Sequence, residues 1–163
     1  MGITEAPSIT NTKLERIAWL SKQDSKKEFG SLMHLFNKES LIDCFKELGK
    51  NKAAGIDGVS KMDYEKNLYG NIDELITKMK AMAYRPAPVR ERLIPKEGKP
   101  GATRPLGISI FEDKIVQKMT QKVLESIYEP VFLECSHGFR PGKSCHTAIK
   151  ALSDYLFKNN IQI

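Results

Sequence analysis

Positively charged side chains around a glycine turn form the segment of this sequence best suited to chemistry. Residues 137–144 read HGFRPGKS, so Arg140 and Lys143 flank a turn that contains Gly138 and Gly142. A guanidinium can bind two phosphate oxygens at once, and an ammonium binds them as a point charge. Ser144 can begin a helix, whose amino-terminal end attracts anions. The segment therefore predicts a contact with phosphate groups.

The letters GKS also end the P-loop pattern, but the rest of that pattern is missing. A P-loop needs a glycine five positions before Gly142, and that position is His137. Pro141 has no backbone N–H to donate where the loop would need one. We therefore expect a turn that holds the backbone of a nucleic acid or a triphosphate, and not a nucleotide-hydrolysing loop.

A second group of cations lies between residues 85 and 104, where six basic residues face only two acidic ones. The chain as a whole has a net charge of +6, and such local concentration is typical of a protein that binds a polyanion. The alternation around 89–94 predicts a strand, followed by a Gly/Pro turn over 96–101 and a returning strand. Its prolines restrict this hairpin to a sheet edge. Lys96 and Arg104 flank the turn.

Other chemistries fit the sequence poorly. Cys135, His137, Cys145 and His146 fall within a dozen residues, but their spacing does not match the two close ligand pairs of a zinc site. Cys145 and His146 are adjacent in an expected helix, so their side chains diverge by about 100° and cannot form a nucleophile pair. We expect neither a metal site nor a catalytic triad in this chain.

The elements that must position these residues are mostly helical. Apolar residues follow helical spacing in six segments, namely 14–18, 29–36, 41–48, 72–82, 115–127 and 148–156. We expect Gly49 to end the third helix, and Ser60, Asn71 and Ser144 to cap later ones. Residues 49–60 read as a glycine-bearing loop, and alternation at residues 161 and 163 predicts the start of a strand. The expected fold class is α+β, mostly helical.

Composition limits the setting of the protein. A chain of 163 residues fits one domain, and its three cysteines predict a reducing compartment instead of a disulfide framework. It has no apolar run near 18 residues, and its first residues, MGITEA, lack the layout of a signal peptide. We therefore expect a soluble cytoplasmic protein with no membrane partner.

Four blocks give a more specific indication. NKAAGIDGVS, YRPAPVRERLIPK, RPLGISIFEDKIVQ and SHGFRPGKSCHTAI occur in this order and spacing. Together they resemble the amino-terminal part of the reverse transcriptases encoded by bacterial group II introns, which also act as intron maturases. The resemblance covers about residues 12–163. It implies the fingers subdomain of a reverse transcriptase, with an edge β-hairpin and several packed helices, in an RNA-associated bacterial protein.

The resemblance also implies a role for individual residues. It divides the chain into an amino-terminal helical extension, residues 1–48, and a fingers region, residues 49–163, that ends at the first palm strand. Lys96 and Arg104 match the basic pair that meets the triphosphate of the incoming dNTP. The residues implied to contact RNA are Lys52, Arg85, Arg90, Arg92, Lys99, Arg140 and Lys143. The RNA partner would be intron RNA, template RNA or an RNA/DNA duplex, and the sequence leaves a homodimer open.

The sequence departs from the family where the chemistry would occur. Polymerases of this family hold Mg²⁺ with an Asp on the next strand and with the Asp pair of a Tyr-x-Asp-Asp turn, and neither is present. Carboxylates must hold the two metal ions of phosphoryl transfer. We therefore expect a truncated polypeptide without a cofactor and inactive alone, whereas the complete enzyme would use Mg²⁺. The alternative is a stand-alone RNA-binding or assembly protein without a catalytic parent.

Overall fold

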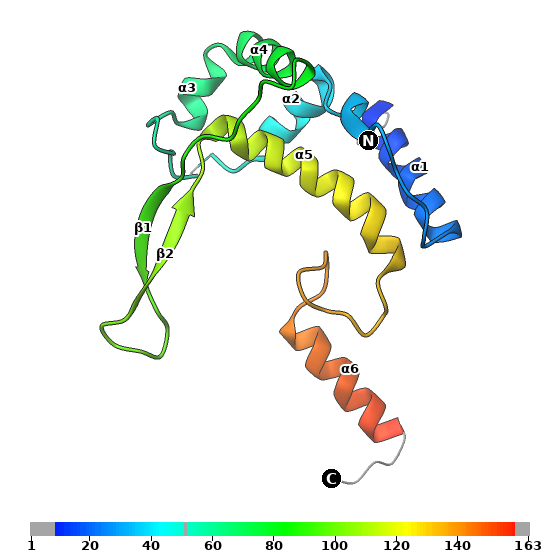
Figure 1. The fold of residues 1–163 in the computed structure, drawn as a ribbon. Coiled ribbons are helices and arrows are strands. Elements are labelled where there is room, and N and C mark those ends of the chain that lie inside the picture. Colours follow the sequence, from blue (N-terminus) through cyan, green and yellow to red (C-terminus); the bar gives the residue numbers. More distant parts are fainter. Residues whose placement is uncertain (1–8, 51, 159–163) are drawn as a thin grey trace, which may run out of the picture.

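The computed structural model describes residues 9–50 and 52–158 and shows a mostly helical chain with one antiparallel hairpin (Figure 1). The α+β class is thus confirmed. The helices are α1 (Ile9–Gln23), η1 (Leu32–Leu35), α2 (Lys38–Glu47), α3 (Lys61–Glu65), α4 (Leu68–Lys80), α5 (Phe111–Tyr128), η2 (Glu129–Val131) and α6 (Cys145–Lys158). The strands are β1 (Arg90–Pro95) and β2 (Thr103–Ile108). The expected strand near residue 161 lies outside the described residues.

The core is built around α5. Ile115, Met119 and Val123 form the buried stripe of this helix, and α1 and α2 pack against it. At its start, the ring of Phe111 lies 5.7 Å from that of Phe45 and 5.6 Å from that of Tyr64, measured between centroids. Since Phe45 lies before residue 49 and Phe111 after it, one core spans the expected boundary. The division into 1–48 and 49–163 stays a prediction.

Two helix starts follow the sequence prediction. Ser60 and Asp63 form a capping box, in which the Ser60 hydroxyl accepts from the Asp63 N–H and the Ser60 N–H reaches the Asp63 carboxylate. Ser144 caps α6 in the same way, because the Thr147 N–H donates to its hydroxyl at 3.3 Å and its own N–H donates to Thr147 Oγ1 at 2.8 Å. Each cap needs only side chains three residues apart, so local sequence determines it.

Three local predictions were wrong. The segment 29–36 forms only the short turn η1, preceded by Ser31 in the left-handed region at φ 56°, which no α-helix can include. Asn71 lies inside α4 instead of capping it, and its side-chain amide donates to the Tyr64 carbonyl. The third, Gly49, does not end α2: Leu48 is the C-cap, and its carbonyl accepts from the buried Lys61 ammonium at 2.5 Å.

A buried carboxylate fixes the hairpin to α5. Asp113 is 2% exposed, and its two oxygens accept from the Tyr84 hydroxyl at 2.5 Å and from the Ala87 N–H at 3.0 Å. The loop before α3 packs against the same end of α5. A Cβ on Gly55 would lie 2.5 Å from Ile110 Cα, so only glycine fits there. The hairpin root is therefore held from two sides.

The elements form an open arch (Figure 1). The hairpin and α6 extend from one side of α5, whereas α2 and α4 lie on the other side. The described side chains of α6 include no buried residue, and its Ile149, Leu152 and Phe157 remain exposed. None of the helices within residues 9–50 and 52–158 has the length and apolar character needed to span a membrane.

Candidate nucleic-acid interface

The strand register sorts the hairpin side chains into two different faces. Residues directly opposite each other in an antiparallel pair point to the same face, and neighbours along a strand alternate. Arg90 pairs with Ile108, Arg92 with Leu106, and Ile94 with Arg104. The three arginines therefore share one face, which we call the basic face. The other face carries Glu91, Leu93 and Pro95 opposite Gly107, Pro105 and Thr103, and no cation.

The arginines of the basic face have no acidic partner. Within residues 9–50 and 52–158, the ion pairs involve none of Arg90, Arg92 and Arg104. Because Arg92 lies opposite Leu106 and Arg104 lies opposite Ile94, these two arginines are diagonal neighbours on the basic face. Like charges at that spacing repel each other. An anion bound between them would relieve the repulsion.

The tip of the hairpin brings together three of the predicted residues. Lys96, Lys99 and Arg104 line a hollow of about 360 Å³, which Pro95 and Glu97 complete. The turn closes through the Lys96 N–H, which donates to the Ala102 carbonyl at 2.9 Å, and its Gly98 and Gly101 have positive φ. The Glu97 carboxylate is the single acid of this hollow. Three cations against one acid favour a small, highly charged anion.

A second cationic cluster lies at the hairpin root. Burial lowers the pKa of Lys114, and the nearby charges of Lys52 and Arg90 lower it further, while Asp57 opposes them. The Lys114 ammonium donates to the Ala53 carbonyl at 2.5 Å, which ties the loop to α5. Lys114 thus lies within electrostatic range of both Lys52 and Arg90. Sequence reasoning missed Lys114, although its place in the first turn of a helix after the hairpin was visible.

Arg85 is exposed but bonded to its own segment. Its guanidinium donates to the Met82 carbonyl at 3.0 Å and to the Tyr84 carbonyl at 2.8 Å. These bonds use one of the two terminal nitrogens, so the other stays available to a ligand. Arg85 can still contact a phosphate, at the point where the chain enters the hairpin.

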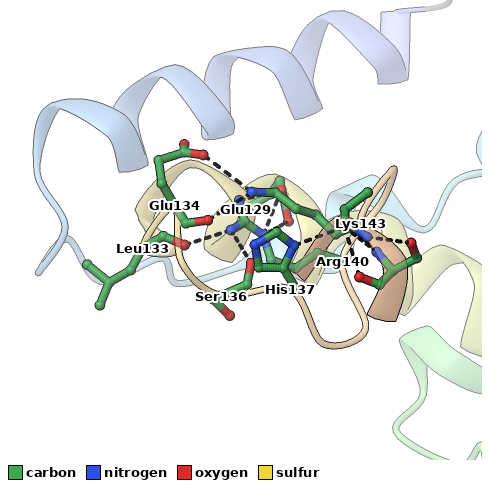
Figure 2. A network of polar contacts seen from close by, with 9 residues as sticks. Glu129, Leu133, Glu134, Ser136, His137, Arg140 and Lys143 are labelled. Carbon is green, nitrogen blue, oxygen red and sulfur yellow. Dashed lines mark hydrogen bonds and ion pairs between the residues drawn. The ribbon is translucent and has the colours of Figure 1, made fainter. Parts of the chain in front are cut away.

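Arg140 is bonded within its own segment. Its side chain is 6% exposed and pairs with Glu129, whose Oε1 accepts from both Nη2 at 2.8 Å and Nε at 3.0 Å (Figure 2). Nη1 donates to the carbonyls of Leu133 and Ser136, and the guanidinium covers the Phe132 ring at 5.2 Å. The bonds to Glu129 raise the pKa of Arg140. The guanidinium thus holds the loop together, and a contact of Arg140 with RNA stays a prediction.

Lys143 is also bonded within the same loop. Its ammonium donates to the Glu134 carbonyl at 2.9 Å and lies 3.3 Å from the Glu134 carboxylate (Figure 2). Its side chain is 22% exposed, and it closes the loop onto the segment after η2. His137 adds a contact between its Nδ1 and Thr147 Oγ1 at 3.0 Å. The glycine turn is therefore an internally bonded junction between α5 and α6.

We expect the double variant Arg140→Gln/Lys143→Gln to disorder this junction without changing the salt dependence of RNA binding. The variant loses the bonds to Glu129 and Glu134, so the loop opens more often to a protease. Limited chymotrypsin digestion should cut faster near Phe132 and Phe139 than in the wild type. A fall of about one to two units in the salt slope would instead place these cations against phosphates.

The described residues offer no site that fits a resident magnesium ion. No group of three or more His, Cys, Asp or Glu side chains gathers within residues 9–50 and 52–158. The buried Asp113 carboxylate is already used by Tyr84 and Ala87. We therefore derive no metal-dependent step from this chain.

Comparison with known proteins identifies the family. The chain is 38% identical over 140 residues to the group II intron-encoded protein LtrA of Lactococcus lactis subsp. cremoris, a match that covers 85% of this chain and 23% of that protein. It is 36% identical over 118 residues to a 91 kDa protein in the cob intron of Schizosaccharomyces pombe, covering 72% of the chain and 14% of that protein.

A shorter match reaches a plant protein. Nuclear intron maturase 1, mitochondrial, of Arabidopsis thaliana is 42% identical over 43 residues, which is 26% of this chain and 6% of that protein. No family model matches the chain. The chain spans about a quarter of the length of the LtrA proteins that it matches. It belongs to the family of group II intron-encoded proteins and corresponds to one segment of them.

Proposed function

We propose that this chain is the RNA-holding fingers portion of a group II intron reverse transcriptase and maturase. The observation that carries the proposal is the basic face, on which Arg90, Arg92 and Arg104 lie together without an acidic partner among the described residues. The complete protein would copy RNA into DNA and assist intron splicing and mobility. Its RNA would be the intron, a template strand or an RNA/DNA duplex.

The shape of the hairpin supports a backbone contact more than a base contact. Its arginines project from an exposed two-stranded ribbon, and guanidinium groups bind phosphate oxygens bidentately. Lys52 and Lys114 extend the positive charge to the hairpin root. A strand of RNA lying along the ribbon would therefore meet cations from root to tip. Phosphate contacts of this kind position a nucleic acid without reading its sequence.

The tip hollow has a separate proposed role. Lys96, Lys99 and Arg104 surround a space that suits the triphosphate of an incoming dNTP. In the complete protein, Arg104→Ala should raise the KM for dNTP roughly tenfold or more, because a hydrogen bond to a charged group contributes about 1.5–3 kcal/mol. Template affinity should change less. Steady-state kinetics with each substrate varied would show this, and the opposite pattern would assign Arg104 to the RNA.

We propose a use of Mg²⁺ only for the complete protein. Two-metal phosphoryl transfer needs carboxylates to hold its cations, and this chain contributes cations instead. The proposed role of residues 49–163 is to position the RNA and the nucleotide. For residues 1–48 we propose an extension whose buried side, including Leu14 and Leu41, supports α5.

The salt dependence of RNA binding tests the proposal directly. The 163-residue chain is titrated into a labelled single-stranded RNA at several salt concentrations, and binding is followed by fluorescence anisotropy. Each neutralised phosphate should add about 0.7 to the log–log slope, so three or more contacts predict a slope steeper than about −2. A flat dependence, or no binding in dilute buffer, would exclude a polyanion partner.

A further inference from the structure

A groove on the exposed side of α5 has no role in the backbone contacts described above. Its volume is about 490 Å³, and its floor is the helix stripe that includes Gln117, Gln121 and Leu124. Tyr84 and Pro86 line one side, where the chain enters the hairpin, and Phe139 from the junction loop lines another. The hairpin and the junction loop both extend from the same side of α5 (Figure 1). The groove therefore lies beside the point where the chain enters the hairpin.

Phe139 is held in a costly conformation at the rim of this groove. Its φ is 56°, in the left-handed region that bulky residues rarely adopt, and its side chain is fully exposed. The strain persists because the next residue, Arg140, is fixed by Glu129 and by two carbonyls. The bonds of Arg140 thus offset the backbone strain at Phe139, and the aromatic ring stays exposed to solvent. A ring presented in this way can accept a flat partner by stacking.

The polar atoms of the groove are mainly acceptors. Gln117 uses its amide nitrogen on Ser109 Oγ at 3.1 Å, and Gln121 uses its own on Glu125 Oε1 at 2.7 Å. Among the described residues, neither glutamine side-chain oxygen receives a hydrogen bond. Glu125, whose Oε1 accepts from Gln121, also lines the groove, whereas both carboxylate oxygens of Asp113 already accept from Tyr84 and Ala87. Such a lining favours a ligand that donates hydrogen bonds and disfavours a phosphate inside.

We propose that this groove receives one unpaired nucleobase that carries an exocyclic amino group, stacked on Phe139. The inference rests on the proposed RNA function. Unpaired bases of RNA commonly stack on aromatic side chains and bond through their edges. The amino group of cytosine, adenine or guanine would donate to Gln117 and Gln121, whereas uracil has no such group. Arg85, between Tyr84 and Pro86, would meet the phosphate outside the groove.

A peptide side chain is the other occupant that an apolar groove could take. The neighbouring charge argues against it, because the exposed Arg85 lies between two residues that line the groove, Tyr84 and Pro86, and attracts a polyanion. The groove, which disfavours a phosphate, and the adjoining Arg85 match the two parts of a nucleotide. The groove accordingly selects the base, and the surroundings attract its phosphates.

The test compares labelled oligocytidylate and oligouridylate of equal length. Cytosine has an amino group at C4 and an acceptor at N3, whereas uracil has a carbonyl at C4 and an N–H at N3. We expect the wild type to bind oligocytidylate about tenfold more tightly. Phe139→Ala should weaken oligocytidylate binding about fivefold or more at unchanged salt slope, since stacking is independent of charge. Gln117→Leu/Gln121→Leu should remove the preference. Phe157→Ala, which truncates an exposed ring of α6, serves as the control and should change neither.

A second measurement guards against a variant that unfolds. In a Trp19→Phe background, the F139W variant carries a single tryptophan, whose emission should be quenched by oligocytidylate. The inference is overturned if F139A binds both oligonucleotides like the wild type, or if an amphipathic peptide quenches F139W and oligocytidylate does not. In both cases a steep salt slope would leave the proposed function intact, whereas its absence would remove the proposed function itself.

Discussion

Replacing Arg90 and Arg92 with glutamine is expected to reduce the salt slope of RNA binding by about 1.4, because each lost phosphate contact removes about 0.7 for a single strand. Both side chains lie on the basic face and neither has an acidic partner among the described residues. Their full charge is therefore available to RNA. The gap in affinity between wild type and variant should narrow about sevenfold between about 50 and about 200 mM salt.

The matched control for this result is Lys66→Gln/Lys78→Gln, which changes the net charge by the same amount. Lys66 is paired with Asp63 at 2.7 Å, and Lys78 with Glu74 at 2.8 Å, so neither contributes a free cation. Anisotropy titrations at three or more salt concentrations give each slope. Equal losses in both double variants would show that RNA senses only total charge, and the basic face would lose its special role.

Phe111→Ala is expected to lower the free energy of unfolding by about 3–5 kcal/mol, the usual cost of truncating a buried phenylalanine. Phe111 is 1% exposed and joins α5 to Phe45 and Tyr64. It lies three residues after the end of β2, so the cavity would form below the hairpin root. In a chain of this size the loss corresponds to a Tm lower by roughly 6–20 °C.

Phe157→Ala is the control for this stability measurement. Phe157 is 86% exposed on α6, and truncation of such a side chain normally changes stability by less than about 0.5 kcal/mol. Urea unfolding followed by circular dichroism measures both variants against the wild type. If both variants lost the same stability, the aromatic cluster around Phe111 would not be the centre of the core.

The parts of the fold that depend on neighbouring residues could be predicted from the sequence. Ser60 and Ser144 cap helices because their partners lie three residues away. The hairpin follows from alternation around a Gly/Pro turn, and its tip necessarily brings Lys96 near Arg104. The helix predicted over 29–36 is absent. Apolar residues at helical spacing can also pack a short turn against a core, and Ser31 with its positive φ interrupts the segment.

At the candidate site, too, contacts between distant segments could not be predicted from the sequence. The arginines between residues 85 and 104 were identified from their number, but only the register of β1 and β2 places Arg90, Arg92 and Arg104 on one face. Lys114 was missed, because its approach to Lys52 requires the loop to pack on α5. In each case a contact between distant segments decided which charges face the same ligand.

The sequence by itself determined the family, the helical periodicity, the hairpin and the excess of positive charge, since each is a property of composition or of residues close together. The tertiary structure decided which cations are available. Arg140 looked suited to phosphate from the sequence, and only folding shows that it is buried and paired with Glu129. Its contact with RNA stays a prediction. Whether a cation can bind an anion depends on the groups that surround it, and tertiary packing determines those groups.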